Sequence, residues 1–132
     1  TMIASASNDG SIKIWQSDGT LNRTIRISGV HNKVSFSPDG KMIVVASDDG
    51  YVRVMSPSGN QIALAAGHRG AVKSASFTPD GNALVSGGAD NTIKMWNRNG
   101  LLQPPLFKDD DWIQEVTFSP DGTTIASVGQ SN

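Results

Sequence analysis

The sequence predicts an all-β protein built from repeated units of four short antiparallel strands. Three Ser/Thr-Pro-Asp-Gly tetrapeptides, each preceded by phenylalanine, recur every 41 residues, at 37–40, 78–81 and 119–122. A second series of alternating segments recurs in register with them, at 12–15, 52–55 and 93–96. No segment sustains apolar residues at helical spacing beside helix-forming residues. A fixed period with strand and turn chemistry throughout is typical of a repeat architecture.

Each period contains the turn and strand signals of one four-stranded unit. Proline fixes φ at the second position of a turn and glycine accepts the positive φ that follows, so each Pro-Asp-Gly is expected to join two strands. The next strand in each unit runs into a dipeptide that suits a two-residue hairpin, such as Asp49-Gly50. The strands after those hairpins, such as 51–55 and 92–96, alternate apolar and cationic side chains, as half-buried strands do. A further turn before a fourth strand is marked by Gly19, Gly59 and Gly100.

Composition limits the partners and the chemistry available to the chain. Eleven Lys and Arg against twelve Asp and Glu give a net charge of −1 without a basic block, so nucleic acid and anionic membranes are not expected as partners. There is no cysteine, and therefore neither a disulfide nor a thiolate metal site. No apolar run reaches the roughly 20 residues of a membrane span, and no signal peptide is evident. We expect a soluble, cytoplasmic protein without metal or cofactor, whose natural start can lie upstream of Thr1.

The repeat resembles that of the WD-repeat family, and the resemblance covers essentially the whole chain. The unit runs from Phe-Ser-Pro-Asp-Gly through an Ala-Ser or Ser-Gly strand and an Asp turn to an Ile-Lys-Ile-Trp strand. The resemblance implies a β-propeller, in which each unit is one blade with strands a to d from the centre outward. It also implies a hydrogen-bonded set of His, Ser or Thr, Asp and Trp inside each blade. The full set occurs once, as His68, Ser86, Asp90 and Trp96.

The other blades match this set only in part, and we expect them to be less rigid. Val45 and Met55 replace Ser and Trp in the second blade, and Ser131 stands where Asp is expected in the last. The partial sets are Ser5, Asp9 and Trp15 in the first blade, Asp49 in the second and Ser127 in the last. The Asp of the family's Trp-Asp dipeptide is itself replaced, by Gln16, Ser56 and Asn97. The repeats are similar to those of bacterial members, with Trp-Asn-Arg-Asn-Gly at 96–100, which implies a bacterial cytoplasmic origin.

Residues 1–132 are expected to form a single propeller segment of about three blades. In family terms the strands read b-c-d, a-b-c-d, a-b-c-d, a-b, thirteen strands in all, with blade parts 1–27, 28–67, 68–108 and 109–132. Propellers close with typically about 4 to 8 blades, so three form an open arc with apolar end faces. Either the chain is part of a longer protein, or copies associate into a ring of six or nine blades. The two interpretations are compatible.

Three groups of residues invite other interpretations. Ser86, His68 and Asp90 contain a nucleophile, a base and a carboxylate, as a hydrolase triad does, but the intrablade set accounts for the same residues. The aspartate run at 109–111 lacks the ligand spacing and the glycine of a calcium loop, so a solvated loop is expected. His31 has no second His or Cys in register with which to share a metal, and it is expected to be a loop residue.

In WD-repeat proteins, partners commonly meet the face made by the d–a and b–c loops. Trp112 is the strongest single candidate, because aromatic and Arg side chains carry much of the binding energy of interfaces, although it could equally pack within its own blade. The resemblance places on this face Asn8, His31, Asn32, Asp48, Arg69, Asp110, Trp112 and Gln130. The sequence therefore predicts a non-catalytic protein-interaction scaffold, with a self-assembling propeller fragment as the alternative. Its partners are expected to be proteins, either further copies of the chain or other proteins.

Overall fold

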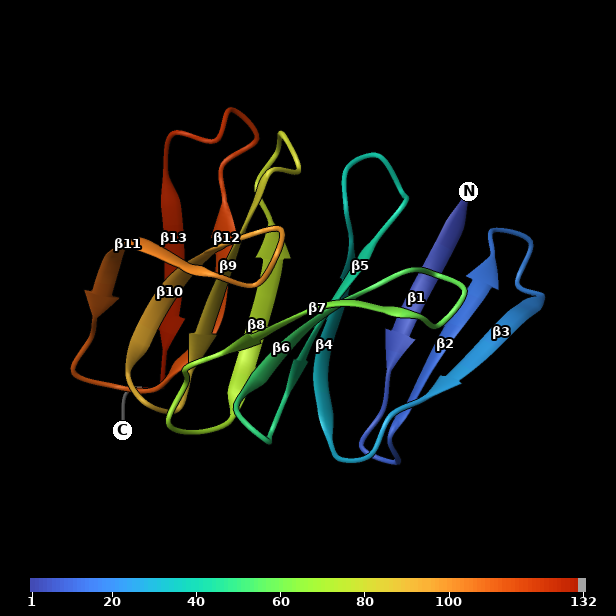
Figure 1. Ribbon diagram of the computed structural model, residues 1–132, viewed down its shortest axis with the longest axis horizontal. Coiled ribbons are helices and arrows are strands. Elements are labelled where there is room, and N and C mark those ends of the chain that lie inside the picture. The colour runs from blue at the N-terminus through green and yellow to red at the C-terminus, as the bar shows by residue number, and fades with distance from the viewer. Residues whose placement is uncertain (131–132) are drawn as a thin grey trace.

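The computed structural model describes residues 1–130 and consists of thirteen antiparallel strands in four sheets (Figure 1). The sheets contain three, four, four and two strands in chain order. This arrangement confirms the predicted all-β class, the four-stranded unit and the strand order. None of residues 1–130 forms a helix, so the described part of the chain contains no helical membrane span.

Each sheet is a meander in which consecutive strands pair. The first sheet comprises β1 (Met2–Ala6), β2 (Ser11–Gln16) and β3 (Leu21–Arg26). The second comprises β4 (His31–Phe36), β5 (Ile43–Ser47), β6 (Tyr51–Met55) and β7 (Gln61–Ala66). The third comprises β8 (Val72–Phe77), β9 (Ala83–Gly88), β10 (Thr92–Asn97) and β11 (Leu102–Lys108), and the fourth comprises β12 (Ile113–Phe118) and β13 (Ile125–Gly129).

The Pro-Asp-Gly segments form the turns between the first two strands of the second, third and fourth sheets. In the first of these turns the Ser37 hydroxyl donates to Asp39 Oδ1 at 2.6 Å, and Gly40 has a φ of 70°. The Asp39 carboxylate also accepts the backbone N–H of Lys41 at 3.0 Å. Thr78 with Asp80 and Ser119 with Asp121 repeat the hydroxyl–carboxylate bond at 2.6 Å. The 41-residue step of the sequence is therefore a step of one sheet.

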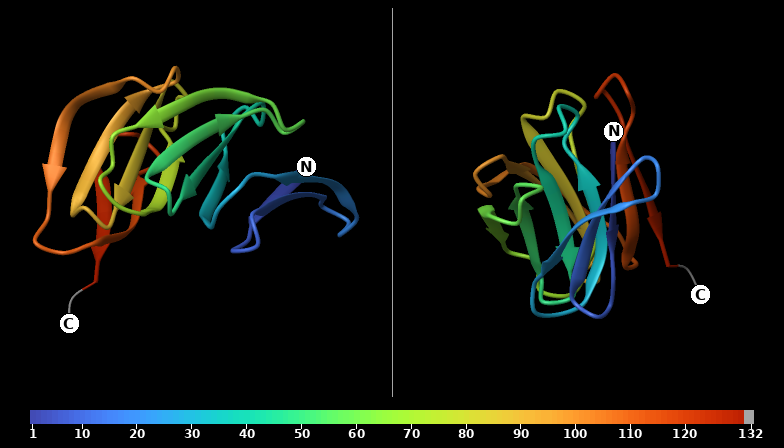
Figure 2. Two further views of the ribbon diagram at one scale, coloured as in Figure 1. Left: turned by 60° about the horizontal axis from the view of Figure 1, so that its bottom comes forward. Right: turned by 90° about the vertical axis from the view of Figure 1, so that its right-hand side faces the viewer.

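The sheets follow one another around an open arc, with β1 to β3 at one end and β12 and β13 at the other (Figures 1 and 2). Apolar side chains fill the space between neighbouring sheets in three buried clusters. The first and second sheets meet through Ile12, Ile14, Ile25, Ile43, Val45 and Met55. The second and third meet through a larger cluster that includes Val44, Val52, Val54, Val72, Leu84 and Trp96. The third and fourth meet through Val85, Ile93, Ile113 and Val116.

The contact between the third and fourth sheets is especially close at Gly87. A Cβ atom at this position would lie 2.4 Å from Cγ2 of Ile113 and 3.0 Å from its Cβ. Both distances are shorter than real Cβ contacts allow, so the absence of a side chain at Gly87 permits β12 to pack against β9. Ala46, one repeat earlier, is buried with its methyl group in place.

The first strands of the three later sheets, β4, β8 and β12, contact one another in turn. Lys33, Ser74 and Glu115 occupy the same place on these three strands, 41 residues apart. The Ser74 hydroxyl donates to Glu115 Oε1 at 2.8 Å, and Lys33 Nζ forms an ion pair with the same oxygen. A chain of polar contacts therefore crosses all three sheets along the inner side of the arc.

Candidate interaction surface and the polar sets within the blades

The third blade brings His68, Ser86, Asp90 and Trp96 into one hydrogen-bonded set. The indole N–H of Trp96 donates to Ser86 Oγ at 2.7 Å, and Ser86 Oγ lies 2.7 Å from His68 Nε2. His68 Nδ1 lies 3.0 Å from Asp90 Oδ1. Ser86 and Trp96 are fully buried, and the carboxylate of Asp90 lies at the edge of the set, where a turn follows β9.

The carboxylate of Asp90 fixes the tautomer of His68. Partial burial opposes ionisation of Asp90, but hydrogen bonds from the Thr92 hydroxyl, the Arg69 backbone N–H and His68 outweigh it and lower the pKa of Asp90 to about 2. An ionised carboxylate can only accept, so His68 Nδ1–H donates to it, and His68 Nε2 is left to accept the Ser86 hydroxyl. Burial lowers the pKa of His68 despite the neighbouring carboxylate, which favours this neutral imidazole.

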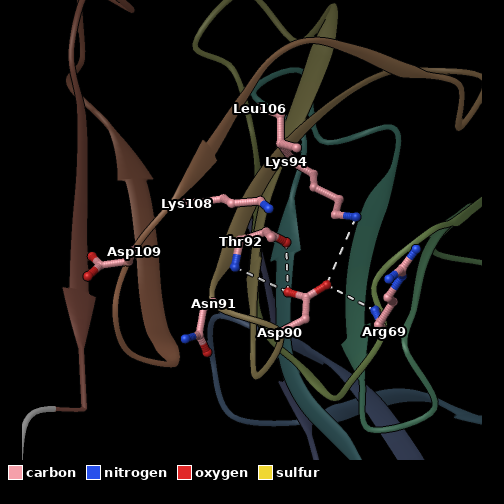
Figure 3. A pocket seen from close by; sticks show the side chains of 8 residues that line it. All are labelled: Arg69, Asp90, Asn91, Thr92, Lys94, Leu106, Lys108 and Asp109. Atoms are coloured by element: carbon pink, nitrogen blue, oxygen red, sulfur yellow. Dashed lines mark hydrogen bonds and ion pairs between the residues drawn. The ribbon is translucent and has the colours of Figure 1, made fainter.

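Asp90 also anchors the loop between β7 and β8 (Figure 3). Its Oδ2 accepts the backbone N–H of Arg69 at 2.9 Å and lies 3.9 Å from Lys94 Nζ. Lys94 in turn donates to the carbonyl of Gly67 at 2.6 Å. These residues border a pocket that is also lined by Asn91, Thr92, Leu106, Lys108 and Asp109. The main chain of the loop is therefore held from two sides, while the Arg69 side chain is exposed.

The burial of Ser86 argues against the hydrolase interpretation. The Ser86 hydroxyl has no exposed surface, donates to His68 and accepts from Trp96. A nucleophile must reach a substrate, and this hydroxyl is enclosed between two sheets. Ser86, His68 and Asp90 are instead hydrogen-bond partners of one another within the blade. Among residues 1–130, no three His, Asp or Glu side chains are grouped as a metal site would require.

The first blade contains a more open version of this set. The Trp15 indole N–H donates to Ser5 Oγ at 2.9 Å, but Ser5 is exposed and Trp15 is only half-buried. In the turn between β1 and β2, hydrogen bonds from the hydroxyl and backbone N–H of Ser11 and from Ser7 lower the pKa of Asp9 to about 2. In the last blade Ser127 is exposed on β13, and Ser131 lies outside the described residues.

The second blade has a different polar set, which the sequence did not reveal. Arg53 bridges Asp49 and Ser47: its Nη2 donates to Asp49 Oδ2 at 2.6 Å and its Nη1 reaches Ser47 Oγ at 3.2 Å. Ser47 Oγ lies 2.9 Å from His31 Nδ1, and His31 Nε2 lies 3.1 Å from the carbonyl of Ile27. Asp49 thus has charged and polar partners, although this blade lacks the Ser and Trp of the third.

The prediction that His31 is a loop residue is wrong, and so is its place on the interaction face. His31 is the first residue of β4 and only 2% exposed, because it fills the position that Val72 and Ile113 fill one and two repeats later. Its cross-strand partner is Ser47, where the later sheets have glycine. The serine hydroxyl supplies the hydrogen bond that a buried imidazole needs.

The remaining residues of the predicted face lie at one end of the sheets, the lower edge in Figure 1, on turns and strand ends. Asn32 Nδ2 donates to Asp48 Oδ1 at 2.6 Å and to the carbonyl of Val72 at 2.7 Å, and Lys73 reaches the same carboxylate at 3.2 Å. These contacts connect the second and third blades. Asn8, Asp48, Arg69, Asp110, Trp112 and Gln130 are exposed there, and Asn32 is partly buried.

Trp112 precedes β12 and is 50% exposed, whereas Ile113 and Val116 are buried against the third blade. Its backbone carbonyl accepts the N–H of Gln130 at 3.0 Å, which ties it to the end of β13. The carbonyl of Asp110 accepts Asn91 Nδ2 at 2.9 Å. The loop that carries Trp112 is therefore fixed through its main chain, while half of the aromatic side chain remains open to solvent.

Comparison with known families agrees with this architecture. The family model described as WD domain, G-beta repeat matches residues 1–16, 19–56 and 59–97. These matches cover more than half of the chain, and the chain belongs to the WD-repeat family. No curated protein matches it. The repeats indicate a propeller module of the kind that mediates protein–protein interactions.

Proposed function

We propose that the chain is a non-catalytic, cytoplasmic scaffold that binds a protein partner through the end of the sheets that carries Arg69 and Trp112. The observation that supports this most is the half-exposed Trp112 on a loop with a fixed main chain. Tryptophan and arginine are enriched among the residues that dominate interface energies. A loop that is already ordered loses little conformational freedom on binding, and this favours affinity.

The surroundings of Trp112 and Arg69 suit a protein partner. Exposed polar residues lie beside Trp112, among them Asp110 on the same loop and Gln130, whose backbone N–H donates to the Trp112 carbonyl, as in the polar rim of an interface. The net charge of −1 provides no field that would attract nucleic acid. The proposed surface is thus a small aromatic and cationic centre within a polar border.

Site-specific photo-crosslinking tests this proposal. A crosslinking side chain at position 112 is expected to capture a defined protein from a bacterial extract, and Arg69→Ala is expected to reduce capture at least fivefold. The matched controls are a crosslinker at Leu101 and the substitution Lys41→Ala, both exposed and at the opposite end of the sheets. Equal capture from positions 112 and 101 would remove Trp112 from the proposal.

A second candidate function is self-assembly into a closed ring, and the apolar side chains exposed at the two ends of the arc, Ile3 and Phe107, favour it. Within residues 1–130 the first sheet has three strands and the fourth has two, whereas the middle sheets have four. Two copies would form six blades and three copies nine. Light scattering over a range of concentrations is expected to give a mass of two or three chains. A monomer at every concentration would contradict this candidate.

A further inference from the structure

The two ends of the arc terminate in strands of the same type. Ser5 in β1 lies opposite Lys13, and Ser86 in β9 lies opposite Lys94 in the same way. In β13, Ser127 lies opposite Val116 of β12, as Ser86 lies opposite Ala75 of β8. β1 and β13 are therefore both second strands of a blade. Among residues 1–130, β1 pairs only with β2 and β13 only with β12.

Each end also exposes apolar side chains. On the first sheet, Ile3 is 54% exposed and lies opposite the half-buried Trp15. On the third sheet, Phe107 is 41% exposed and borders a groove together with Ile93 and Ile125. The groove lies on the face of the third sheet that β12 and β13 cover only in part.

The packing between the second and third sheets shows which side chain fits such a groove. Trp96 packs there in one cluster with Val52, Val54 and Ala65. By strand pairing, Val52 lies opposite Ala65 as Ile93 lies opposite Phe107 one repeat later. Trp15 takes the place of Trp96 in the first sheet. A Trp15 side chain is therefore expected to fit the groove at Ile93 and Phe107, as Trp96 fits the corresponding place one repeat earlier.

The chain cannot bring its own Trp15 to that groove, because β1 and β12 lie at opposite ends of the arc (Figures 1 and 2). We propose that a second copy of this chain docks by strand exchange: β12 of one copy pairs with β1 of the next, and β13 of the first copy is released. This builds a blade in the order β12, β1, β2, β3, with the same antiparallel pattern as β4 to β7.

β1 and the turn after it keep their place because their side chains bind β2. Ser5 Oγ accepts the Trp15 N–H at 2.9 Å, and Asp9 accepts the hydroxyl and the backbone N–H of Ser11 at 2.6 and 2.9 Å. The end of β13 is secured to β12 by the side-chain contact between Gln130 and Gln114, at 2.7 Å. In the exchanged pair, Asn8 takes the position of Gln130 and supplies the same kind of amide.

Charge on the innermost strands is complementary across the same junction. Within one chain Lys33 and Glu115 form an ion pair beside Ser74. In the exchanged arrangement β12 of one copy is followed by β4 of the next, so Glu115 of the first lies beside Lys33 of the second. Each junction thereby joins opposite charges, whereas two identical ends would bring like charges together.

This inference rests on the self-assembly candidate and not on binding through Arg69 or Trp112. Two cysteine pairs test it, since the chain has no other cysteine. Thr117 lies opposite Ala126 of β13, and strand exchange would place it opposite Ala4 of the second copy. Cross-strand partners lie within disulfide range. We expect oxidised Thr117→Cys with Ala4→Cys to give disulfide-linked dimers or trimers. Oxidised Thr117→Cys with Ala126→Cys should lock β13 in place and remain monomeric, and reduction should restore assembly.

The outcomes distinguish the failure of self-assembly from the failure of strand exchange alone. A monomeric unmodified chain would overturn both self-assembly and strand exchange. A defined oligomer that gives no intermolecular disulfide from positions 4 and 117, and persists when positions 117 and 126 are linked, would overturn strand exchange alone. Circular dichroism of the reduced variants verifies that each retains the β-sheet fold, and both variants carry the same Thr117→Cys change.

Discussion

The hydroxyl of Ser86 accepts the indole N–H of Trp96 and donates to Nε2 of His68, so one buried oxygen serves two buried rings. Ser86→Ala leaves both ring nitrogens without a partner. A buried unsatisfied polar group costs about 1–3 kcal/mol, so we expect the free energy of unfolding to fall by about 2–5 kcal/mol. Urea denaturation measures the change. The exposed Ser17→Ala serves as the control, and a similar loss at both positions would refute the account of the buried set.

The pH dependence of stability should reflect His68. Its folded pKa is lowered by burial, so the unfolded chain binds a proton more readily. The contribution of neutral His68 is therefore complete above its ordinary value of 6.5 and is lost as the pH falls from there toward the folded pKa. We expect the midpoint of denaturation to decrease as the pH is lowered from 7.5 to 5.5, and to decrease by less in the His68→Asn variant. Parallel pH profiles of the two proteins would contradict this prediction.

Asp90 should add a second loss of stability at lower pH. Its folded pKa is about 2 against an ordinary value of 3.8, so its contribution is present above 3.8 and is lost as the pH falls toward 2. Asp90→Asn is expected to remove part of this acid-induced loss and to lower stability at pH 7. Circular dichroism during acid titration measures the first effect, and urea denaturation at pH 7 measures the second. An unchanged acid midpoint in the variant would show that the carboxylate has no special role.

His31 and Ser47 should be energetically coupled. Ser47→Ala leaves the buried imidazole without its Nδ1 partner, which is expected to cost about 1–3 kcal/mol. His31→Val restores the side chain that the next sheet has at this place, so the double variant should lose less than the two single variants together. A coupling free energy of at least about 0.5 kcal/mol from a double-mutant cycle is expected. Simple additivity would mean that the two side chains act independently.

Gly87 should be intolerant of a methyl group. Gly87→Ala places Cβ at 2.4 Å from Ile113 Cγ2, and overpacking of this kind typically costs about 1–3 kcal/mol. Ile113→Ala removes the obstructing atoms, so we expect Gly87→Ala to cost less in an Ile113→Ala background. Thermal denaturation of the four proteins measures this. If the cost is the same in both backgrounds, contact with Ile113 is not its cause.

The strand order and the turn positions could be predicted because turn chemistry is local. A Pro-Asp-Gly segment defines a turn whatever surrounds it, and its 41-residue step fixes the succession of strands. The hydrogen-bonded set around Trp96 could be predicted from the family resemblance. The 41-residue spacing of Lys33, Ser74 and Glu115 was also present in the sequence, but spacing alone does not reveal that the three side chains point to the same side.

The polar set of the second blade could not be predicted for a different reason. His31 contacts Ser47 only because a register shift between His31 and Lys33 aligns the two strands there. Such a shift depends on how the whole sheet pairs and leaves no local signal in the sequence. The sequence predicted a loop residue at His31, whereas His31 is the buried first residue of β4.

The polar set of each complete blade comes from that blade's own strands and turns, and this affects how the repeats can diverge. His31, Ser47, Asp49 and Arg53 satisfy one another as His68, Ser86, Asp90 and Trp96 do, although the two sets share only one residue type at the same position. A mutation in one set can therefore be compensated by a second mutation in the same blade, without changes elsewhere. A duplicated blade would carry its polar set with it into its new place, and gain or loss of blades need not disturb the polar sets of the others.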